Sequence, residues 1–368
     1  MHVLVTSDAV GGVWTYTREL VSGLVRRGHR VSLVSFGQLP KEHQLLWMRG
    51  LPRLEYYATD FPLEWMQDSE QGISASIDYL LRLIHSIKPD VLHSNQYCYG
   101  ALQCSIPKIV VAHSDVLSWW SEVHGDAPPQ TPSLLWYRDL VSTGLARADV
   151  VVAPSHWMLD ALTPHYSIPA GAVVVYNGRD AALFQPSLAK SPRVLSVGRV
   201  WDEGKQITLL LKRPQALPVC IAGPNQHPER RQGANAEAGS ADQTVELMGI
   251  RSEEELCSLY AKSAIYAMTS RYEPFGLAPV EAALSGCALI ANDIPTFREL
   301  WGDAAIYFHR NDPDALADAI RTLGDDRELC EDFANRACRH ARERFDSQRM
   351  VSEYETLYHQ VACQRVAA

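Results

Sequence analysis

The sequence predicts an α/β protein with two doubly wound domains, each built around a parallel sheet. Three observations support this fold class. Short β-branched runs alternate with helical stretches along the whole chain, which is the pattern of stacked βαβ units. These runs form two series, each of about six strands. The chain has 368 residues, more than one ordinary hydrophobic core accommodates.

The expected strands divide evenly between the two halves of the chain. In the first half they are His2–Thr6, Val31–Phe36, Asp90–Ser94, Ile109–His113, Val150–Ala153 and Val173–Tyr176. In the second half they are Val194–Val197, Val219–Ala222, Val245–Met248, Ile265–Met268, Ala288–Ala291 and Ile306–Phe308. Sheets of this kind bind ligands beyond the carboxyl ends of their strands, so chemistry is expected in the loops that follow the strands.

Helices are expected between the strands. Examples are Thr15–Arg27, Ala75–Ser86, Glu253–Lys262, Pro279–Leu284, Pro313–Leu323 and Ser347–Val361. The stretches Gly37–Ser74 and Asn225–Thr244 show no clear period and are expected to be irregular. The pattern is also interrupted around Asp180–Pro192, where we place the domain boundary.

The composition excludes several classes of function. The net charge is −9, so no overall field attracts the chain to nucleic acid or to anionic lipid. The eight cysteines include no CxxC pair and no Cys/His group at zinc spacing. No apolar run approaches the roughly 18 residues of a membrane span. We therefore expect a cytoplasmic protein without nucleic-acid partners, whose contact with membranes is at most peripheral.

Two adjacent glycines, Gly11 and Gly12, lead from the end of the first strand into a helix. Adjacent glycines let a backbone approach a ligand closely, and the N-terminus of the following helix favours an anion. A tight turn without a ligand would use the same residues. The pattern is not the GxGxxG fingerprint of dinucleotide-binding domains, so both interpretations remain open.

Two cations, Arg199 and Lys205, follow the strand Val194–Val197. Because both lie behind the same strand end, they can converge on one anionic group at the carboxyl edge of the sheet. A loop that contains arginine and lysine is also common on a solvated surface. The position directly after the strand-end Gly198 favours the anion-binding interpretation.

Two acids, Glu273 and Glu281, lie eight residues apart in the segment RYEPFGLAPVE. Glu273 follows the strand Ile265–Met268. Pro279 suits the first turn of the next helix, which would place Glu281 in that turn. The first N–H groups of this helix are expected to be available to an anionic ligand. The residues alone leave two interpretations, an acid/base pair or two groups that hold a ligand.

Two histidines, His93 and His113, lie at the ends of successive strands in the first domain. A single histidine after a strand is usually structural. Two of them at neighbouring strand ends indicate that both line one site, and His113 is the stronger candidate for a function.

Together these segments resemble the retaining glycosyltransferases of the GT-B fold, the group 1 or family 4 class. The matching segments are Gly11-Gly12, Ala153-Pro-Ser-His-Trp157, Tyr176-Asn-Gly-Arg-Asp-Ala-Ala-Leu-Phe-Gln-Pro186, Val197-Gly-Arg with Lys205, and Glu273 to Glu281, which matches the E-x7-E motif of the family. They occur in the family's order over nearly the whole chain. Each match alone is a weak indication of the family. Together, in this order and at these spacings, the matches are a strong one.

The resemblance implies two Rossmann-like domains that face a central cleft. It implies an acceptor-binding domain at residues 1–178, a hinge at 179–192 and a domain for the nucleotide-sugar donor at 193–346. The last helix of the family returns to the N-terminal domain, so the helix within 347–368 is expected to pack there.

The resemblance also assigns roles to single residues. Arg199 and Lys205 would bind the donor diphosphate with the help of Gly11 and Gly12, and Glu281 would hold the ribose hydroxyls. The transferred sugar would be contacted by Glu273, Phe275, Gly276, Leu277 and His113, and the base by Gly249 and Ile250. Of these, Glu273, His113, Arg199 and Lys205 are the expected catalytic residues. Candidates for the acceptor side are Trp14, His93, Asp115 and Trp119.

Three positions depart from the family pattern. Gln206 replaces a usual glycine, Arg179 a small apolar residue, and Thr269 a common proline. None of them is expected to touch the two acids or the two cations, so we interpret them as adjustments of the site around these four residues. Arg179 and Trp14 are expected to shape the site for a particular acceptor.

The expected reaction moves a hexose-type sugar from a nucleoside diphosphate to an acceptor hydroxyl with retention of configuration. No DxD-like metal motif fits a strand end, so Arg199 and Lys205 would meet the charge of the departing diphosphate without a metal or another cofactor. The sequence does not separate UDP, GDP and ADP sugars, and it does not fix the acceptor or the oligomeric state.

Three other functions stay open. A glycoside hydrolase also uses two carboxylates, but it does not need paired cations behind a strand-end glycine. A non-hydrolysing sugar-nucleotide epimerase shares the two-domain architecture. The third alternative is a protein that binds a nucleotide sugar without turning it over.

Overall fold

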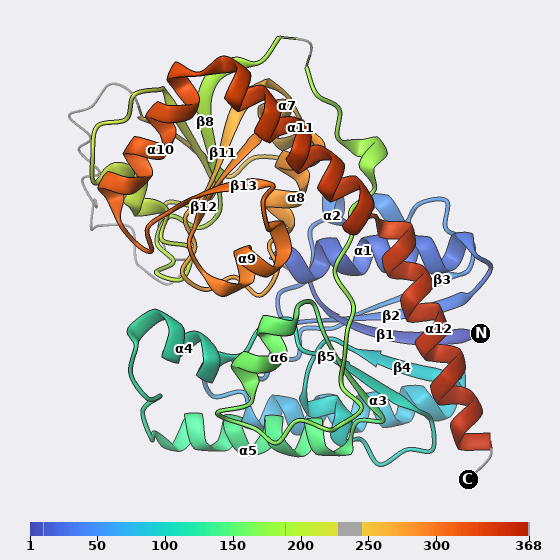
Figure 1. Ribbon diagram of the computed structural model, residues 1–368. Coiled ribbons are helices and arrows are strands. Elements are labelled where there is room, and N and C mark those ends of the chain that lie inside the picture. Colours follow the sequence, from blue (N-terminus) through green and yellow to red (C-terminus); the bar gives the residue numbers. More distant parts are fainter. Residues whose placement is uncertain (10, 188, 227–244, 367–368) are drawn as a thin grey trace. The chain divides into compact units, whose positions relative to one another are not determined.

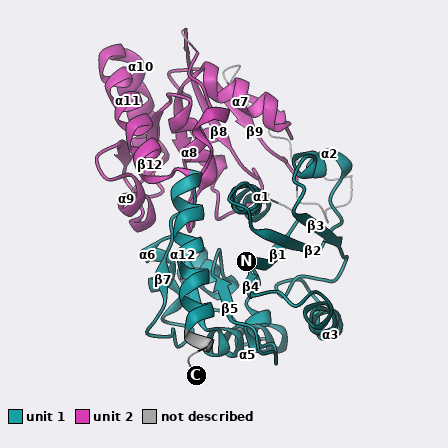
Figure 2. Cartoon of the chain, turned by 90° about the vertical axis from the view of Figure 1, so that its right-hand side faces the viewer, with its two compact units in different colours: residues 1–178, 347–368 teal, residues 179–346 magenta. Residues whose placement is uncertain are grey.

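A computed structural model of the chain describes residues 1–9, 11–187, 189–226 and 245–366 (Figure 1). The chain divides into two compact units. Unit 1 comprises Met1–Gly178 and Ser347–Ala368, and unit 2 comprises Arg179–Asp346 (Figure 2). Both units are α/β domains around a parallel sheet, so the predicted fold class is confirmed. The stretch Asn225–Thr244 lies outside the described residues, apart from its first two.

Unit 1 contains a seven-stranded parallel sheet in the order β3-β2-β1-β4-β5-β6-β7. The strands are β1 His2–Asp8, β2 Arg30–Phe36, β3 Leu54–Ala58, β4 Val91–Ser94, β5 Lys108–Val111, β6 Val150–Ala153 and β7 Val173–Val174. The strand order reverses between β1 and β4. In doubly wound sheets a ligand binds at this switch point, beyond the carboxyl ends of the two strands.

Helices cover both faces of this sheet, with α1 on one face and α3 and α5 on the other (Figure 1). The helices of unit 1 are α1 Gly11–Arg26, α2 Glu42–Leu45, α3 Glu70–Ile87, α4 Val116–His124, α5 Pro132–Arg147, α6 His156–Leu162 and α12 Ser347–Val366. Two short 3-10 helices, η1 Leu46–Met48 and η2 Cys98–Ala101, lie between them.

The strand β3 was not predicted, because the stretch Gly37–Ser74 was expected to be irregular. β3 pairs only with β2, at the edge of the sheet. Its residues Leu54-Glu-Tyr-Tyr-Ala58 are half-buried or exposed throughout, with no buried face. An edge strand of this kind lacks the alternation of apolar and polar residues on which a sequence prediction depends.

The last helix, α12, packs along α1 in unit 1. The two helices approach closely at Gly23, where an added Cβ would lie 2.4 Å from Cγ2 of Val351. Polar contacts also join them at the end of α1. The Glu355 carboxylate accepts from Arg27 at 2.8 Å and lies 2.7 Å from the His29 ring. The C-terminal segment is therefore part of the fold of unit 1.

His93 of β4 lies in the core between the sheet and α12. Its side chain is fully buried, and both ring nitrogens meet tyrosine hydroxyls, Tyr16 at 3.2 Å and Tyr358 at 2.8 Å. Burial, reinforced by the nearby His113, lowers the pKa of His93 to about 3. His93 is thus a neutral packing residue, and this placement corrects the expectation that it contacts an acceptor.

The buried His93 is expected to make the stability of the protein depend on pH. Below pH 6.5 the unfolded chain binds a proton at this histidine, whereas the folded chain does not until the pH approaches 3. The stability that neutral His93 preserves is therefore lost as the pH falls through this window. A single group of this kind lowers the free energy of unfolding by about 2 kcal/mol between pH 7 and pH 5.

Urea unfolding at pH 7 and pH 5 measures this effect. The variant His93→Gln is expected to lose less stability on acidification than the wild type. The matched control is His85→Gln on α3, which changes an exposed histidine. If His93→Gln kept the full pH dependence, other groups would have to cause it.

Unit 2 contains a six-stranded parallel sheet in the order β10-β9-β8-β11-β12-β13. The strands are β8 Ser191–Val197, β9 Val219–Ala222, β10 Val245–Gly249, β11 Ser263–Met268, β12 Ala288–Asn292 and β13 Ala305–Phe308. The helices are η3 Ala181–Leu183, η4 Ile207–Leu211, α7 Glu253–Lys262, α8 Leu277–Leu284, α9 Pro295–Trp301, α10 Pro313–Asp325 and α11 Arg327–Arg344. The switch point of this sheet lies between β8 and β11. The expected hinge at residues 179–192 is counted within this unit.

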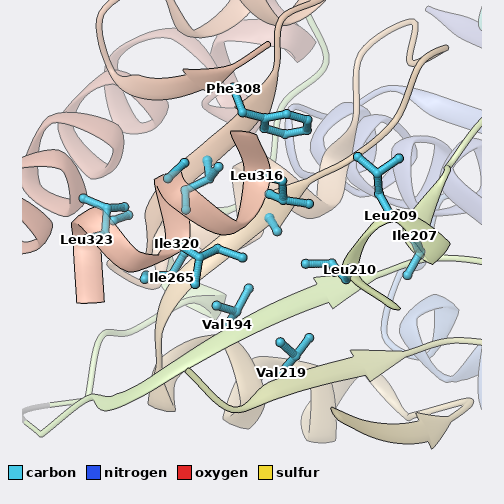
Figure 3. Close-up of a cluster of buried hydrophobic side chains, with 14 of the residues drawn as sticks. Val194, Ile207, Leu209, Leu210, Val219, Ile265, Phe308, Leu316, Ile320 and Leu323 are labelled. Carbon is cyan, nitrogen blue, oxygen red and sulfur yellow. The ribbon is translucent and has the colours of Figure 1, made fainter. Parts of the chain in front are cut away.

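A hydrophobic core joins the centre of this sheet to η4 and α10 (Figure 3). Its labelled members are Val194, Ile207, Leu209, Leu210, Val219, Ile265, Phe308, Leu316, Ile320 and Leu323. Each of them is almost completely buried. Full burial of one such side chain stabilises the fold by about 1.5–3 kcal/mol. Because β8 and β11 are fixed in this way, the loops that follow them start from rigid supports.

Candidate active site

The predicted candidates Lys205 and Glu273 meet at the switch point of unit 2. Lys205 lies in the loop after β8 and Glu273 in the loop after β11, and these strands are neighbours at the centre of the sheet. The Lys205 Nζ lies 2.6 Å from Oε2 of Glu273. Ser270 donates to the same oxygen at 3.0 Å. A cation and an acid from two separate motifs thus form one polar cluster.

Two glycines let the loop after β8 pass close to the end of β9. A Cβ on Gly223 would lie 1.9 Å from the carbonyl oxygen of Gly198. The Gly198 amide in turn donates to the Ala222 carbonyl at 2.9 Å. This approach determines where the chain leaves β8, and therefore where the following Arg199 and Lys205 begin.

Arg199 is held by a residue that the sequence reasoning did not single out. Its Nε and Nη2 both donate to Oδ2 of Asp202, at 3.0 and 2.6 Å. The guanidinium also lies over the Trp201 ring, 5.3 Å from its centre. Asp202 accepts from the Gly204 amide through its other oxygen. The spacing of three residues between an arginine and an aspartate in one loop is the signal that could have identified this pair.

Gly276 leaves space for the side chain of Glu273. The residue has a φ of +86°, which disfavours other residues, and a Cβ there would lie 3.1 Å from Cγ of Glu273. Phe275 before it is buried and packs against Phe345, with 5.2 Å between ring centres. The turn between the two acids is therefore fixed by a glycine on one side and an aromatic anchor on the other.

The helix α8 begins at Leu277, directly after Gly276. Pro279 was expected to open this helix, with Glu281 in its first turn. Because the φ of Gly276 lets the chain turn into the helix earlier, Glu281 is the fifth helical residue and lies in the second turn. Gly276 offers no side chain to cap the first N–H groups. Simple compensation of the helix dipole does not account for Glu281, since the first turn of α8 contains no acid.

The Glu281 carboxylate is paired with Arg179, which corrects one expectation. Arg179 Nε lies 2.9 Å from Oε1 of Glu281, and Arg179 Nη2 donates to Glu253 at 2.9 Å. Arg179 was not expected to touch either acid. Its side chain is in fact only 1% exposed. Burial and the neighbouring Glu281 raise the pKa of Tyr260 well above its ordinary value.

The other two departures from the family pattern also lie against the cluster. Thr269 donates its hydroxyl to the Lys205 carbonyl at 2.9 Å. Gln206 has a φ of +50°, which explains why a glycine is usual there. In the orientation that satisfies its neighbours, its amide donates to Asn311 and to the Thr269 carbonyl, and accepts from Arg271. The expectation that none of the three touches an acid or a cation is therefore wrong for Arg179; Thr269 contacts the backbone of Lys205.

Gly249 and Ile250 lie at the carboxyl end of β10, on the same edge of the sheet. Gly249 has a φ of +67°, and its carbonyl accepts from the Gly223 amide at 2.8 Å. Ile250 is 79% exposed. An exposed apolar surface suits a flat base, and this contact stays a prediction.

In unit 1, His113 follows β5, the neighbour of β4 at the carboxyl edge of the sheet. Its Nε2 lies 2.8 Å from Oδ1 of Asn95, the residue directly after β4. Asn95 Nδ2 donates to the Thr6 carbonyl, so its Oδ1 accepts from His113. Burial lowers the pKa of His113 to about 3, which keeps the ring neutral. Asn95 was missed because only the folded strand order places it beside His113.

Gly11 and Gly12 form the start of α1, after the end of β1. Gly11 has a φ of +75°, both residues are exposed, and a Cβ on either would meet no atom within 4 Å. This space is open to a ligand within unit 1. The expected parts of Gly11, Gly12 and His113 in donor binding stay predictions.

The expected acceptor residues have different surroundings. Asp115 is buried, caps α4 through the Ser118 amide, and accepts from the hydroxyls of Tyr137 and Tyr166. Trp14 is also buried and packs edge-on against Trp47 and Tyr56. Both side chains contribute to the packing of unit 1, and their expected acceptor role stays a prediction. Trp119 is half-buried beside Trp120 and His124, and its role stays a prediction.

Two family models match successive parts of the chain. The model described as Glycosyltransferase Family 4 matches residues 10–183, and the model described as Glycosyl transferases group 1 matches residues 180–340. The chain belongs to the group 1 glycosyltransferases. Its two doubly wound units are the GT-B fold of that class. The resemblance inferred from the sequence motifs is therefore confirmed.

Relatives of this group 1 chain include two bacterial proteins. The O-antigen chain mannosyltransferase RfbU of Salmonella typhimurium is 25% identical over 195 residues, which are 51% of this chain and 55% of that protein. The D-inositol 3-phosphate glycosyltransferase of Corynebacterium efficiens is 28% identical over 373 residues, which are 90% of this chain and 86% of that protein. The match to the first relative thus spans little more than half of its length.

Solved structures share the fold of this group 1 chain over almost its full length. A sucrose-phosphate synthase from Thermosynechococcus elongatus has a TM-score of 0.82 at 19% identity, over 99% of this chain and 100% of that one. Anabaena HepE in complex with UDP-glucose has a TM-score of 0.72 at 20% identity, over 97% of this chain and 99% of that one.

Two general properties of the group 1 chain complete the description. Within the described part of the chain, no three His, Cys, Asp or Glu side chains gather in a way that could hold a metal ion. None of the helices that the structure describes is long and apolar enough to cross a bilayer.

Proposed function

We propose that this chain is a retaining glycosyltransferase that moves a hexose-type sugar from a nucleoside diphosphate to an acceptor hydroxyl. The observation that carries the proposal is the Lys205–Glu273 pair at the switch point of unit 2, 2.6 Å apart and directly before the N-terminus of α8. HepE, which shares the fold, is described with UDP-glucose bound. A diphosphate and a sugar need the charges and the hydrogen-bond acceptors that this cluster supplies.

The difficult step is the separation of a sugar cation from a diphosphate. The bond between the sugar C1 and the phosphate oxygen breaks, and its electron pair leaves with the diphosphate. Lys205, Arg199 and the first N–H groups of α8 meet this charge. One cation at ~4 Å contributes about 4 kcal/mol at an effective dielectric constant near 20. The acceptor oxygen bonds to C1 on the same face, and its proton passes to an oxygen of the leaving phosphate. The reaction needs no metal ion.

The surroundings of the two acids favour this function over hydrolysis. A glycoside hydrolase keeps one of its two carboxyl groups protonated as a general acid. Here Glu273 faces the ammonium of Lys205, and Glu281 faces the guanidinium of Arg179. Each acid thus lies against a cation, whereas the general acid of a hydrolase must give a proton to the leaving group. The carboxyl oxygens of the two acids are suited to accept hydrogen bonds from sugar and ribose hydroxyls.

A thermal-shift screen with UDP, GDP and ADP sugars tests the proposal. One nucleotide sugar is expected to raise the melting temperature by several degrees, because a ligand at 100 times its Kd adds about 2.7 kcal/mol to the stability. Its pairing with candidate acceptors should then yield a glycoside with the anomeric configuration of the donor, visible by NMR.

Other outcomes would identify other functions. Release of free sugar from a glycoside in the absence of nucleotide would indicate a hydrolase. Epimerised nucleotide sugar formed without acceptor would indicate an epimerase. A protein that responds to none of the nucleotides would contradict the proposed function altogether.

A further inference from the structure

We propose that Arg179 is a positioning residue that fixes the Glu281 carboxylate, and that this restraint makes the nucleotide site select ribonucleotides over 2′-deoxyribonucleotides. The inference rests on the proposed function, in which Glu281 holds the ribose hydroxyls. It concerns a position at which this chain departs from the pattern of its family. Arg179 itself needs no contact with the ligand.

The backbone of Arg179 is anchored next to the start of unit 2. Its amide donates to the Phe345 carbonyl at 2.9 Å, and the residue forms an isolated parallel bridge with Asp346. The guanidinium carbon lies 5.0 Å from the centre of the Phe184 ring. The side chain is also buried. The backbone contacts and the Phe184 ring together therefore hold the guanidinium in one location.

From this location the guanidinium joins two helices. Its Nε lies 2.9 Å from Oε1 of Glu281 on α8, and its Nη2 donates to Oε1 of Glu253, the first residue of α7, at 2.9 Å. Glu253 is about half exposed, whereas the Glu281 side chain is only 13% exposed. A planar guanidinium presents its donors in a rigid fork. The contact with Glu281 is an ion pair and the contact with Glu253 is a hydrogen bond. A lysine at position 179 would keep the charge, but its single ammonium lacks the two separate nitrogens through which Arg179 meets the two carboxylates.

A fixed carboxylate discriminates between ligands that a rotating one would accept alike. The 2′- and 3′-hydroxyls of a ribose form a vicinal diol that can donate two hydrogen bonds to one carboxylate. If the 2′-hydroxyl is absent and Glu281 cannot rotate, a carboxylate oxygen with little access to water loses its partner, which weakens binding. If Glu281 were free to rotate, it could turn toward the remaining hydroxyl and toward water. The selectivity would then fall.

Isothermal titration calorimetry with paired nucleotides measures this selectivity. The probes are UDP, GDP and ADP, each with its 2′-deoxy counterpart, and the pair whose ribonucleotide binds the wild type is used. The wild type is expected to prefer the ribonucleotide at least about tenfold. Arg179→Met is expected to bind the ribonucleotide more weakly and to prefer it less than about threefold. The matched control is Arg213→Met, which changes an exposed arginine of unit 2 paired with Asp314. It should keep the wild-type ratio.

Further variants separate positioning from a general loss of structure. Arg179→Lys retains the buried charge and should also lower the ratio, whereas a generally damaged site would weaken both nucleotides equally and leave the ratio unchanged. In a Glu281→Gln background, Arg179→Met should have no further effect on the ratio. If Arg179→Met does not fold, as judged by circular dichroism, the ratio of Arg179→Lys decides.

The outcomes distinguish the two proposals. A wild-type protein that binds none of the nucleoside diphosphates contradicts the proposed function. A wild type that binds them but shows no preference for ribose overturns the present inference alone. A folded Arg179→Lys or Arg179→Met variant with the wild-type ratio overturns it as well.

Discussion

Replacement of both Arg199 and Lys205 by alanine is expected to abolish sugar transfer, with a fall in kcat of at least about 10³. Removal of one preorganised group that stabilises developing charge typically costs about 10²–10³ in rate. The two cations occupy the same loop, with Lys205 bound to Glu273 and Arg199 to Asp202. Without them only the N–H groups of α8 would stabilise the negative charge of the departing diphosphate. Initial rates at saturating donor and acceptor measure the loss.

The matched control for this variant is the pair Lys212→Ala and Arg213→Ala. These two cations are adjacent and exposed in the same unit, and they should leave kcat within about twofold of the wild type. The rates are to be measured with EDTA and with added Mg²⁺. Activity of the wild type in EDTA would agree with the proposed reaction. Rescue of the Arg199/Lys205 variant by Mg²⁺ would contradict the metal-independent mechanism.

Alanine at Glu273 is expected to lower kcat about 10²–10³-fold while the Kd of the donor changes little. Glu273 is proposed to hold the transferred sugar, so its contacts matter most as the sugar becomes a cation. Alanine at Glu281 should instead weaken donor binding, about tenfold or more, because two hydrogen bonds to the ribose are lost. Calorimetry with the donor and steady-state kinetics separate the two effects.

Two further variants sharpen the comparison of the acids. Glu273→Gln keeps a group that can accept from Ser270 but removes the charge opposite Lys205, so its kcat reports on the charge alone. Glu254→Ala changes an exposed acid on α7 and should leave both kcat and Kd unchanged. If Glu273→Ala and Glu281→Ala both kept full activity, neither acid would hold the donor.

The fold was predictable wherever burial imposes a pattern on the sequence. Both parallel sheets follow from alternating apolar runs and helices, since their central strands are covered on both faces. The edge strand Leu54–Ala58 lacks a buried face and therefore had no such pattern. The early start of α8 depends on the left-handed φ of Gly276, a property of the backbone that a sequence pattern does not reveal.

The candidate site was predictable where its residues lie directly behind strands. Lys205 and Glu273 could be expected to meet, because strand ends converge at one edge of the sheet. His93 shows the limit of this rule, since it lies one residue before the end of β4 and points into the core. Arg179 shows a second limit. Its partners Glu253 and Glu281 are 74 and 102 residues away, and only the folded chain brings them together.

The return of α12 to unit 1 has a consequence for the order of folding during synthesis. Unit 2 is one continuous stretch, Arg179–Asp346, and all of it leaves the ribosome before α12 does. The first 178 residues must wait for Tyr354 and Tyr358, which are fully buried in the completed unit. At a synthesis rate of about 5–20 residues per second, this delay lasts roughly ten seconds or more. The half of the protein that is made first is therefore finished last, and during that interval the surface of α1 that α12 will cover is open to chaperones.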